Sequence, residues 1–207
     1  MKIQALILLF VVITLCLSVT NSIPLQVVNI EKWKSRQDTT LFPFADNTYR
    51  LTLHMFDSTN VEEGRPNVLL IFEQIIKGSR RLIFEDSLYS MFPNISVDDY
   101  NNDGIKDILV FFYTGARANP AYHLYLRDMK HHSLIRVIGF EELPNPMLDE
   151  KNNIIISLAL SGTHHYSFYR INAKNKLINL GHDFEADPGD TLKYENAIQQ
   201  IRKKYKN

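Results

Sequence analysis

Short β-rich segments recur about every ten residues along this chain, and clusters of turn-forming residues separate them. Breaks of this kind include Glu63-Gly64-Arg65-Pro66, Lys77-Gly78 and Asn119-Pro120. Because alternate residues of a strand face opposite sides, such segments form antiparallel sheets that share a core. We therefore predict an all-β fold, with antiparallel sheets in a sandwich or small propeller-like arrangement. The expected strands are Thr48–Met55, Asn67–Ile76, Arg81–Tyr89, Asp107–Tyr113, Tyr122–Arg127, Leu134–Ile138, Ile154–Leu160, His165–Ile171 and Lys176–Leu180.

The end of the chain has a different periodicity, which indicates a helix. Tyr194, Ile198, Ile201 and Tyr205 recur at helical spacing between residues 191 and 205, and Asp190 is a candidate N-cap. No internal repeat is evident. We therefore expect one β-rich domain over residues 47–207, preceded by an irregular lead over residues 23–46.

The first 22 residues have the composition of a secretory signal peptide. Lys2 supplies a positive charge, residues 5–17 are apolar, and the small or polar residues 18–22 follow. The apolar run is too short for a comfortable membrane span. Cys16, the only cysteine, leaves a lipoprotein anchor as the alternative, although Leu15 precedes it where a small residue is expected. We predict a periplasmic or secreted protein with no membrane span after the signal is removed.

Charge gives no indication of a nucleic-acid partner. The chain has 23 basic and 23 acidic residues, so its formal net charge is zero. Nucleic-acid-binding domains usually carry a clear excess of basic residues on one face. The basic residues 202–204 near the C-terminus are read as a solvated helix face.

One loop carries a metal-binding pattern. Residues 99–107 read D-Y-N-N-D-G-I-K-D, with oxygen-bearing side chains at positions 1, 3, 5 and 9 and glycine at position 6. Ca²⁺ takes six to eight oxygen ligands, and a tight loop presents alternate side chains inward. Gly104 allows the sharp turn through a positive φ. The expected ligands are Asp99, Asn101, Asp103, the Ile105 carbonyl and Asp107. The alternative is a polar Asx-Gly turn joining two strands.

This loop differs from an EF-hand. Position 12 is Val110, which cannot supply the bidentate carboxylate, and an apolar strand pattern follows in place of a helix. Asp98, Asp86 or water would complete the coordination. We expect a dissociation constant on the order of 10⁻⁵ to 10⁻³ M, as in extracellular modules, and hence a structural role for the ion.

Catalytic motifs are absent from the sequence, which predicts that the protein is not an enzyme. It contains no G-x-S-x-G, H-E-x-x-H, P-loop or G-x-G-x-x-G pattern. Ser161 beside His164 or His165 resembles a hairpin tip more than a catalytic triad. The pairs Glu141-Glu142 and Asp149-Glu150 are read as solvated loop carboxylates.

Several short motifs together resemble a known family. The calcium loop is followed by Tyr122-His123-Leu124-Tyr125-Leu126, then by residues 142–149 (E-L-P-N-P-M-L-D) and Ser161-Gly162-Thr163-His164-His165-Tyr166. In this order they resemble the bacterial periplasmic family of calcium-binding, lysozyme-inhibitor-like immunity proteins. That family protects cells against peptidoglycan-cleaving effectors of type IV secretion systems. The bend at residues 115–120 departs from the family pattern, and residues 23–96 have no match to it.

The resemblance implies a function and a binding surface. It implies an exported calcium-binding protein that inhibits a peptidoglycan hydrolase or lysozyme-like effector by inserting a loop in its active cleft. The partner-binding residues would be Ser161, Gly162, His164, His165, Tyr166 and Tyr122. Two alternatives remain: a calcium-stapled binding or adhesion module without inhibitory activity, and a hydrolase assembled from distant residues.

Overall fold

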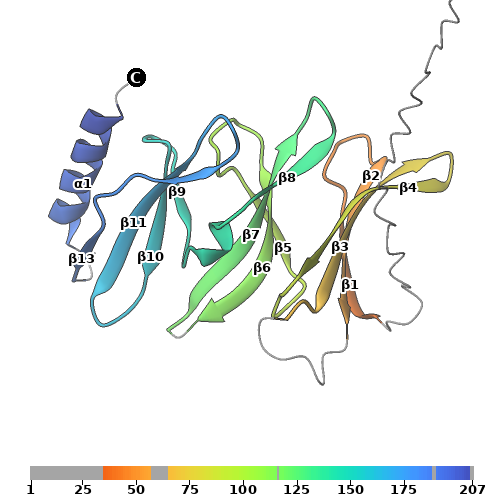
Figure 1. The fold of residues 1–207 in the computed structure, drawn as a ribbon, viewed down its shortest axis with the longest axis horizontal. Helices are drawn as coiled ribbons and strands as arrows, with labels where there is room; N and C mark the ends of the chain where they lie inside the picture. The colour runs from red at the N-terminus through yellow and green to blue at the C-terminus, as the bar shows by residue number, and fades with distance from the viewer. Residues whose placement is uncertain (1–34, 57–64, 116, 188–189, 206–207) are drawn as a thin grey trace, which may run out of the picture. The chain divides into compact units, whose positions relative to one another are not determined.

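The computed structural model describes residues 35–56, 65–115, 117–187 and 190–205. The predicted signal peptide and residues 23–34 of the expected lead lie outside these ranges. The described residues form three antiparallel sheets and one C-terminal helix, and within them no sheet closes into a barrel (Figure 1). The all-β prediction is confirmed.

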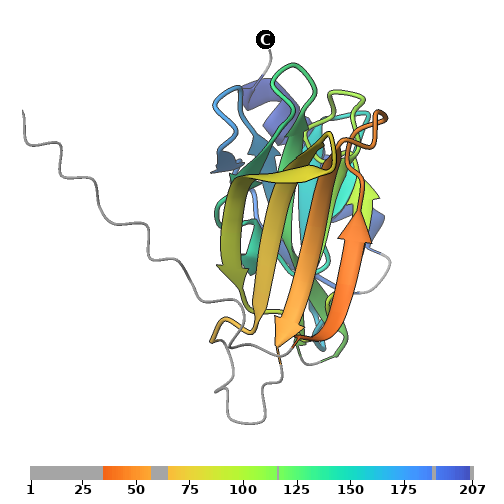
Figure 2. The ribbon, with the colours of Figure 1, turned by 90° about the vertical axis from the view of Figure 1, so that its right-hand side faces the viewer.

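The first sheet contains four strands in sequence order. These are β1 (Ser35–Leu41), β2 (Tyr49–Phe56), β3 (Val68–Ile76) and β4 (Ser79–Leu88), which lie side by side in Figure 2. The prediction of an irregular lead up to residue 46 is wrong for β1, which pairs with β2 from Ser35 to Leu41. This strand was missed because it is an edge strand of mostly polar residues, S-R-Q-D-T-T-L, and has no apolar alternation.

The second sheet has the same order and follows directly. It consists of β5 (Ile95–Asp98), β6 (Asp107–Gly115), β7 (Asn119–Asp128) and β8 (Ser133–Val137). A 3₁₀ turn, η2 (Phe140–Glu142), leads out of it. Residues 99–107, which we call the acidic loop, therefore connect β5 to β6, and the bend after Gly115 connects β6 to β7.

The third sheet is built around β10 and β11. Its strands are β9 (Met147–Asp149), β10 (Ile154–Ala159), β11 (His164–Ile171) and β12 (Leu177–Asn179), while β13 (Phe184–Ala186) pairs with the first residues of β11. β5, β9 and β13 contain only three or four residues each, too few for a periodicity to appear in the sequence.

Alternating side chains of β6 show how the sheets share their cores. Ile108 and Val110 pack with Leu53 and Leu70 of the first sheet. Leu109, between them in the sequence, packs with Ile155 of the third sheet. The second sheet is thus buried on both faces by period-two alternation.

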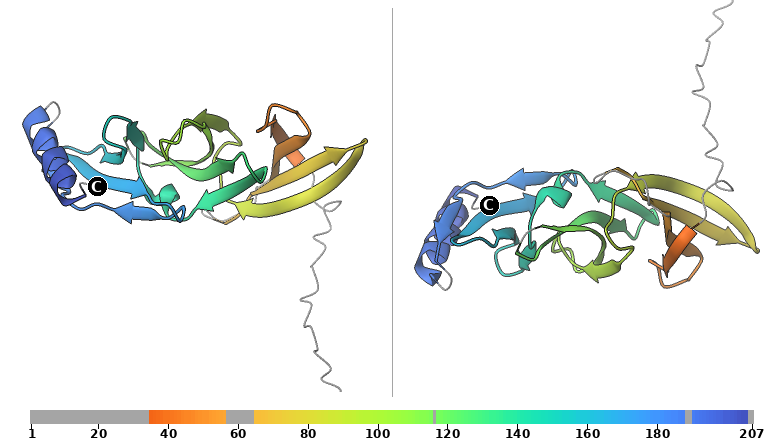
Figure 3. Two further views of the ribbon diagram at one scale, coloured as in Figure 1. Left: turned by 90° about the horizontal axis from the view of Figure 1, so that it is seen from above. Right: turned by 90° about the horizontal axis from the view of Figure 1, so that it is seen from below.

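The helix α1 (Thr191–Lys204) covers the third sheet, as Figure 3 shows. Ile198 and Ile201 pack on Phe168 and its apolar neighbours, as the helical spacing predicted. The predicted cap is also confirmed, because Asp190 Oδ1 accepts a hydrogen bond from the Lys193 amide at 3.4 Å. No helix in the described part of the chain is long and apolar enough to cross a membrane.

Candidate functional site

The acidic loop folds back on itself through left-handed backbone positions. Gly104 has φ of 83° and Asn102 has φ of 58°, and Asn is among the residues that tolerate this conformation. Asp99 Oδ2 accepts from the Gly104 amide and Asp103 Oδ1 from the Ile105 amide, both at 2.8 Å. Asn101 Nδ2 donates to Asp103 Oδ2, also at 2.8 Å. The predicted turn and its glycine are therefore present.

Asp107 differs from the other carboxylates of the loop because it is completely buried. Its Oδ2 accepts from the Tyr100 amide at 3.0 Å and its Oδ1 from the Arg127 amide at 3.4 Å. Burial raises the pKa of Asp107 to about 7, and the charges of Asp103 and Asp99 act in the same direction against the two amide bonds. A buried carboxylate near two others is a position that a cation would stabilise.

The oxygen donors of the loop are of the type that a hard cation prefers, but their side chains do not point to one common position. In the described ranges no group of three acidic, histidine or cysteine side chains is arranged to hold a metal ion. Asp99 and Asp103 each accept hydrogen bonds from amides of the loop. Asp86, considered above as a further ligand, instead binds Arg136. Calcium binding at Asp99, Asn101, Asp103, Ile105 and Asp107 stays a prediction.

The acidic loop also connects the second and third sheets. The Tyr100 hydroxyl donates to the Pro146 carbonyl at 2.8 Å, and Asn102 Nδ2 donates to the Glu150 carbonyl at 3.1 Å. The Tyr100 ring meets Phe140 edge to face, with 5.0 Å between centroids. An ion that ordered this loop would therefore strengthen the junction between the two sheets.

The predicted partner hairpin has an exposed polar tip. Ser161, Gly162 and Thr163 are exposed between β10 and β11, and the Ser161 hydroxyl donates to the Thr163 carbonyl. The side chain of Asn119, at the start of β7, brackets the adjoining Leu160. Asn119 Oδ1 accepts from the Leu160 amide at 2.8 Å, and its Nδ2 donates to the Leu160 carbonyl at 3.1 Å.

These bonds place two hairpin tips side by side. A β-carbon added to Gly162 would lie 3.9 Å from Nη1 of Arg117, in the turn between β6 and β7. Both turns lie along the lower edge in Figure 1. We call Arg117 together with residues 161–163 the paired tips. Of the paired tips, the sequence analysis identified only residues 161–163, because Arg117 is distant in sequence and approaches them only in the folded chain.

The other residues predicted to bind a partner do not all reach the paired tips. His164 and His165 begin β11, with His165 exposed. Tyr166 is half-buried and stacks on Phe184, with 4.8 Å between ring centroids. Its ring therefore packs on the third sheet.

Tyr122 lies on a different element. It belongs to β7, meets Phe111 edge to face at 5.7 Å, and lines a groove that also includes Pro120, Asn145 and Met147. Asn145 Nδ2 donates to Asn119 Oδ1 at 2.6 Å, so this groove adjoins the paired tips through Asn119.

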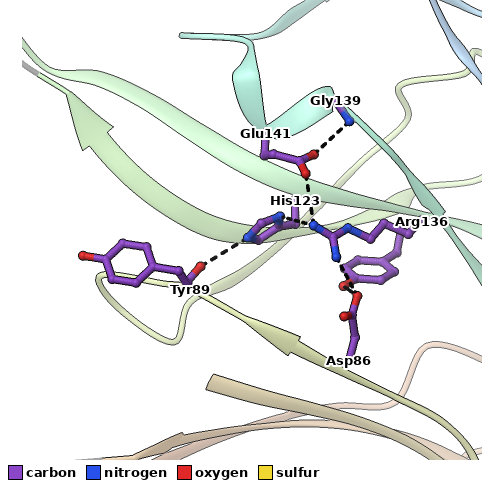
Figure 4. Close-up of polar contacts among 7 residues, drawn as sticks. Asp86, Tyr89, His123, Arg136, Gly139 and Glu141 are labelled. Carbon is purple, nitrogen blue, oxygen red and sulfur yellow. Dashed lines mark hydrogen bonds and ion pairs between the residues drawn. The ribbon is translucent and has the colours of Figure 1, made fainter. Parts of the chain in front are cut away.

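A polar network that sequence reasoning missed joins the first two sheets (Figure 4). Arg136 on β8 donates from Nη1 to Asp86 on β4 at 2.9 Å and from Nη2 to Glu141 at 3.0 Å. The Tyr125 hydroxyl donates to the same oxygen of Asp86 at 2.8 Å. The interpretation of Glu141 as a solvated carboxylate is therefore wrong. The signal that could have revealed the network is a set of polar residues within apolar strand patterns.

His123 completes this network in its neutral form. Arg136 Nη2 donates to His123 Nδ1 at 3.2 Å, so Nε2 carries the proton and donates to the Tyr89 carbonyl, also at 3.2 Å. Burial lowers the pKa of His123, and the charge of Arg136 lowers it further. Since the carboxylates, His123 and two nitrogens of Arg136 are bonded to one another, the network is suited to joining the strands that carry it.

No protein-family model and no curated protein matches this sequence. One solved structure is similar in part: a proposed 6-phosphogluconolactonase from Bacteroides fragilis, 12% identical, with a TM-score of 0.34. The match covers 72% of this chain, and the chain spans only 39% of that protein. A likeness this distant carries no argument about activity.

Proposed function

We propose that this protein is an exported, calcium-binding inhibitor of a peptidoglycan-cleaving, lysozyme-like enzyme and acts as an immunity protein. It blocks the enzyme's cleft and is not itself an enzyme. The observation that supports this most is the bracketing of Leu160 by Asn119, which holds two exposed hairpin tips together.

The target's chemistry explains why such tips suit the role. A muramidase cleft is concave and has two carboxyl groups flanking the scissile bond, about 5 to 9 Å apart depending on mechanism. A blocker needs a stiff protrusion that offers hydrogen-bond donors. Thr163 provides a hydroxyl group, whereas that of Ser161 already donates within the tip, and Gly162 lets the cleft wall approach the backbone closely. Because the Asn119 hydrogen bonds hold the tips in place before binding, less conformational entropy is lost when the complex forms.

Calcium takes a structural part in this proposal. The acidic loop lies at the start of β6, and Arg117 of the paired tips lies just beyond its end. The two are therefore separated by the length of β6, about 27 Å at 3.4 Å per residue. An ion in the loop would therefore lie too far away to contact the tips themselves. It would strengthen the junction between sheets in a compartment with ample calcium, which agrees with the predicted export.

The proposal is tested by inhibition of peptidoglycan cleavage. The exported chain would be assayed against chicken-type, goose-type and phage-type lysozymes on labelled peptidoglycan. We expect inhibition of at least one enzyme, and its loss in Gly162→Arg. A β-carbon added at Gly162 comes near Arg117 Nη1 alone, at an ordinary contact distance of 3.9 Å, so this variant should fold. Ser79→Arg, at the exposed first residue of β4, is the matched control and should inhibit normally.

The same assay separates the alternatives. A parent chain that inhibits no lysozyme overturns the proposal, and stabilisation by Ca²⁺ would then favour the calcium-stapled binding module. Release of soluble fragments by the chain alone would favour a hydrolase.

A further inference from the structure

The turn between β6 and β7 has an unusual backbone at its apex. Arg117 has φ of 61° and the next residue, Ala118, has φ of 55°. Residues with a β-carbon rarely adopt this left-handed region, and hairpin turns that require it usually contain glycine or asparagine. Strained positions persist where the surrounding structure holds them, and they concentrate at binding sites. This turn therefore displays Arg117 at a conformational cost.

The guanidinium of Arg117 is available for an outside partner. Other arginines donate to oxygen atoms within the fold, namely Arg50, Arg127, Arg136, Arg170 and Arg202. Arg117 is exposed, and in the described part of the chain no carboxylate forms an ion pair with it. Its Nη1 lies over Gly162 in the paired tips.

Charge is concentrated at this one residue. Residues 115–120 and 160–163 contain no lysine, no other arginine and no acidic residue. An arginine presents its N–H donors in a planar fork that matches a carboxylate in two parallel hydrogen bonds. A lysozyme cleft has such carboxylates at its centre. The positive charge of the tips would thus complement the carboxylates of such a cleft.

We propose that Arg117 pairs with a catalytic carboxylate of the inhibited enzyme and so determines which enzymes the protein blocks. This inference rests on the proposed function. The protein would bind hydrolases whose cleft carboxylates the Arg117 guanidinium can reach. It would reject hydrolases whose clefts are lined by basic residues.

The test compares the parent with Arg117→Lys, Arg117→Gln and Arg117→Glu, using the same three lysozymes. Arg81→Glu, an exposed arginine in the first sheet, is the matched control. Because removing one partner of a buried charge pair is costly, we expect roughly hundredfold weaker inhibition for Arg117→Glu and about tenfold for Arg117→Lys. Melting temperatures should stay at the parent's value for all four variants.

A second measurement separates pairing from general charge attraction. Affinity would be measured for each Arg117 variant against a lysozyme whose catalytic glutamate is changed to glutamine. We expect the enzyme variant to weaken binding of the parent but to have little further effect on Arg117→Gln, as in a double-mutant cycle of contacting residues. Equal inhibition by the parent and Arg117→Glu, or independent effects in the cycle, would overturn this inference and leave the proposed function standing. No inhibition by the parent would overturn both.

Discussion

Arg136 on β8 donates to Asp86 on β4 across 2.9 Å, which ties the second sheet to the first. The same guanidinium reaches Glu141 at 3.0 Å, so one cation serves two carboxylates. All three side chains are largely buried, with 20% to 26% of each exposed. Breaking this network should therefore cost more than breaking an exposed ion pair, because a largely buried charge would lose its partner.

Arg136→Ala should destabilise the fold because it leaves Asp86 and Glu141 without their cation. We expect the free energy of unfolding to fall by about 2 to 3 kcal/mol, below the range for fully buried pairs because these groups retain some solvent. Urea denaturation measures this change. Arg81→Ala is the control, with an expected change within about 0.5 kcal/mol. Equal values for the two variants would show that the network contributes no net stability.

Protonation of His123 should destabilise the folded state in mild acid. Its pKa is lowered in the folded state, whereas in the unfolded chain it should be near 6.5, so the unfolded state binds more protons just below that pH. The contribution is present above about pH 6.5 and is lost as the pH falls toward the folded-state pKa. Urea denaturation between pH 7.5 and about pH 5 measures this contribution as the difference in slope between the parent and a His123 variant, because Asp107, whose raised pKa acts in the opposite direction, contributes equally to both.

Two variants check the assignment to His123. His123→Gln should flatten the pH dependence, although it also loses stability at neutral pH because its bonds to Arg136 and Tyr89 change. His165→Gln, at an exposed histidine, should keep the parent's slope. An unchanged slope in His123→Gln would assign the acid sensitivity to other groups.

Calcium should raise the melting temperature through the acidic loop. Binding to the folded state alone adds about 2.7 kcal/mol at a hundredfold excess over the dissociation constant. Asp103→Ala removes an expected charged ligand and should abolish most of this gain, whereas Asp183→Ala, at an exposed aspartate outside the loop, should not. Calorimetry in EDTA and in millimolar Ca²⁺ measures the difference. The prediction fails if the parent melts at the same temperature in both.

Tyr166→Ala should lower stability because the tyrosine ring packs on Phe184 and the helix-facing core. We expect a loss of about 2 kcal/mol, less than for a fully buried aromatic residue. Tyr166→Phe keeps the stacked rings and should match the parent in thermal denaturation. If Tyr166→Ala is as stable as the parent, the ring's contact contributes little and its role lies elsewhere.

The sequence predicted the parts of this fold that depend on local pattern. The apolar alternation of β6 and the helical spacing of Ile198 and Ile201 each identified an element. Gly104 identified the sharp turn of the acidic loop. In β1 the pattern was missing because an edge strand of polar residues is specified by its pairing with β2.

The features that depend on distant residues could not be predicted in this way. Asn119 and Leu160 meet only because the second and third sheets pack together, and the paired tips exist through that contact. Likewise, Arg136 finds Asp86 fifty residues earlier in the chain. A single sequence has no periodicity that reports such contacts.

Competition for the enzyme's cleft tests the central claim most directly. A lysozyme that the protein inhibits would be titrated with the protein in increasing concentrations of chitotriose, an oligosaccharide that binds in the active cleft. If the paired tips occupy the cleft, the apparent dissociation constant should rise in proportion to chitotriose, and Gly162→Arg should bind weakly throughout. Binding of the parent that is unaffected by saturating chitotriose would contradict the account, because the protein would then be attached outside the cleft.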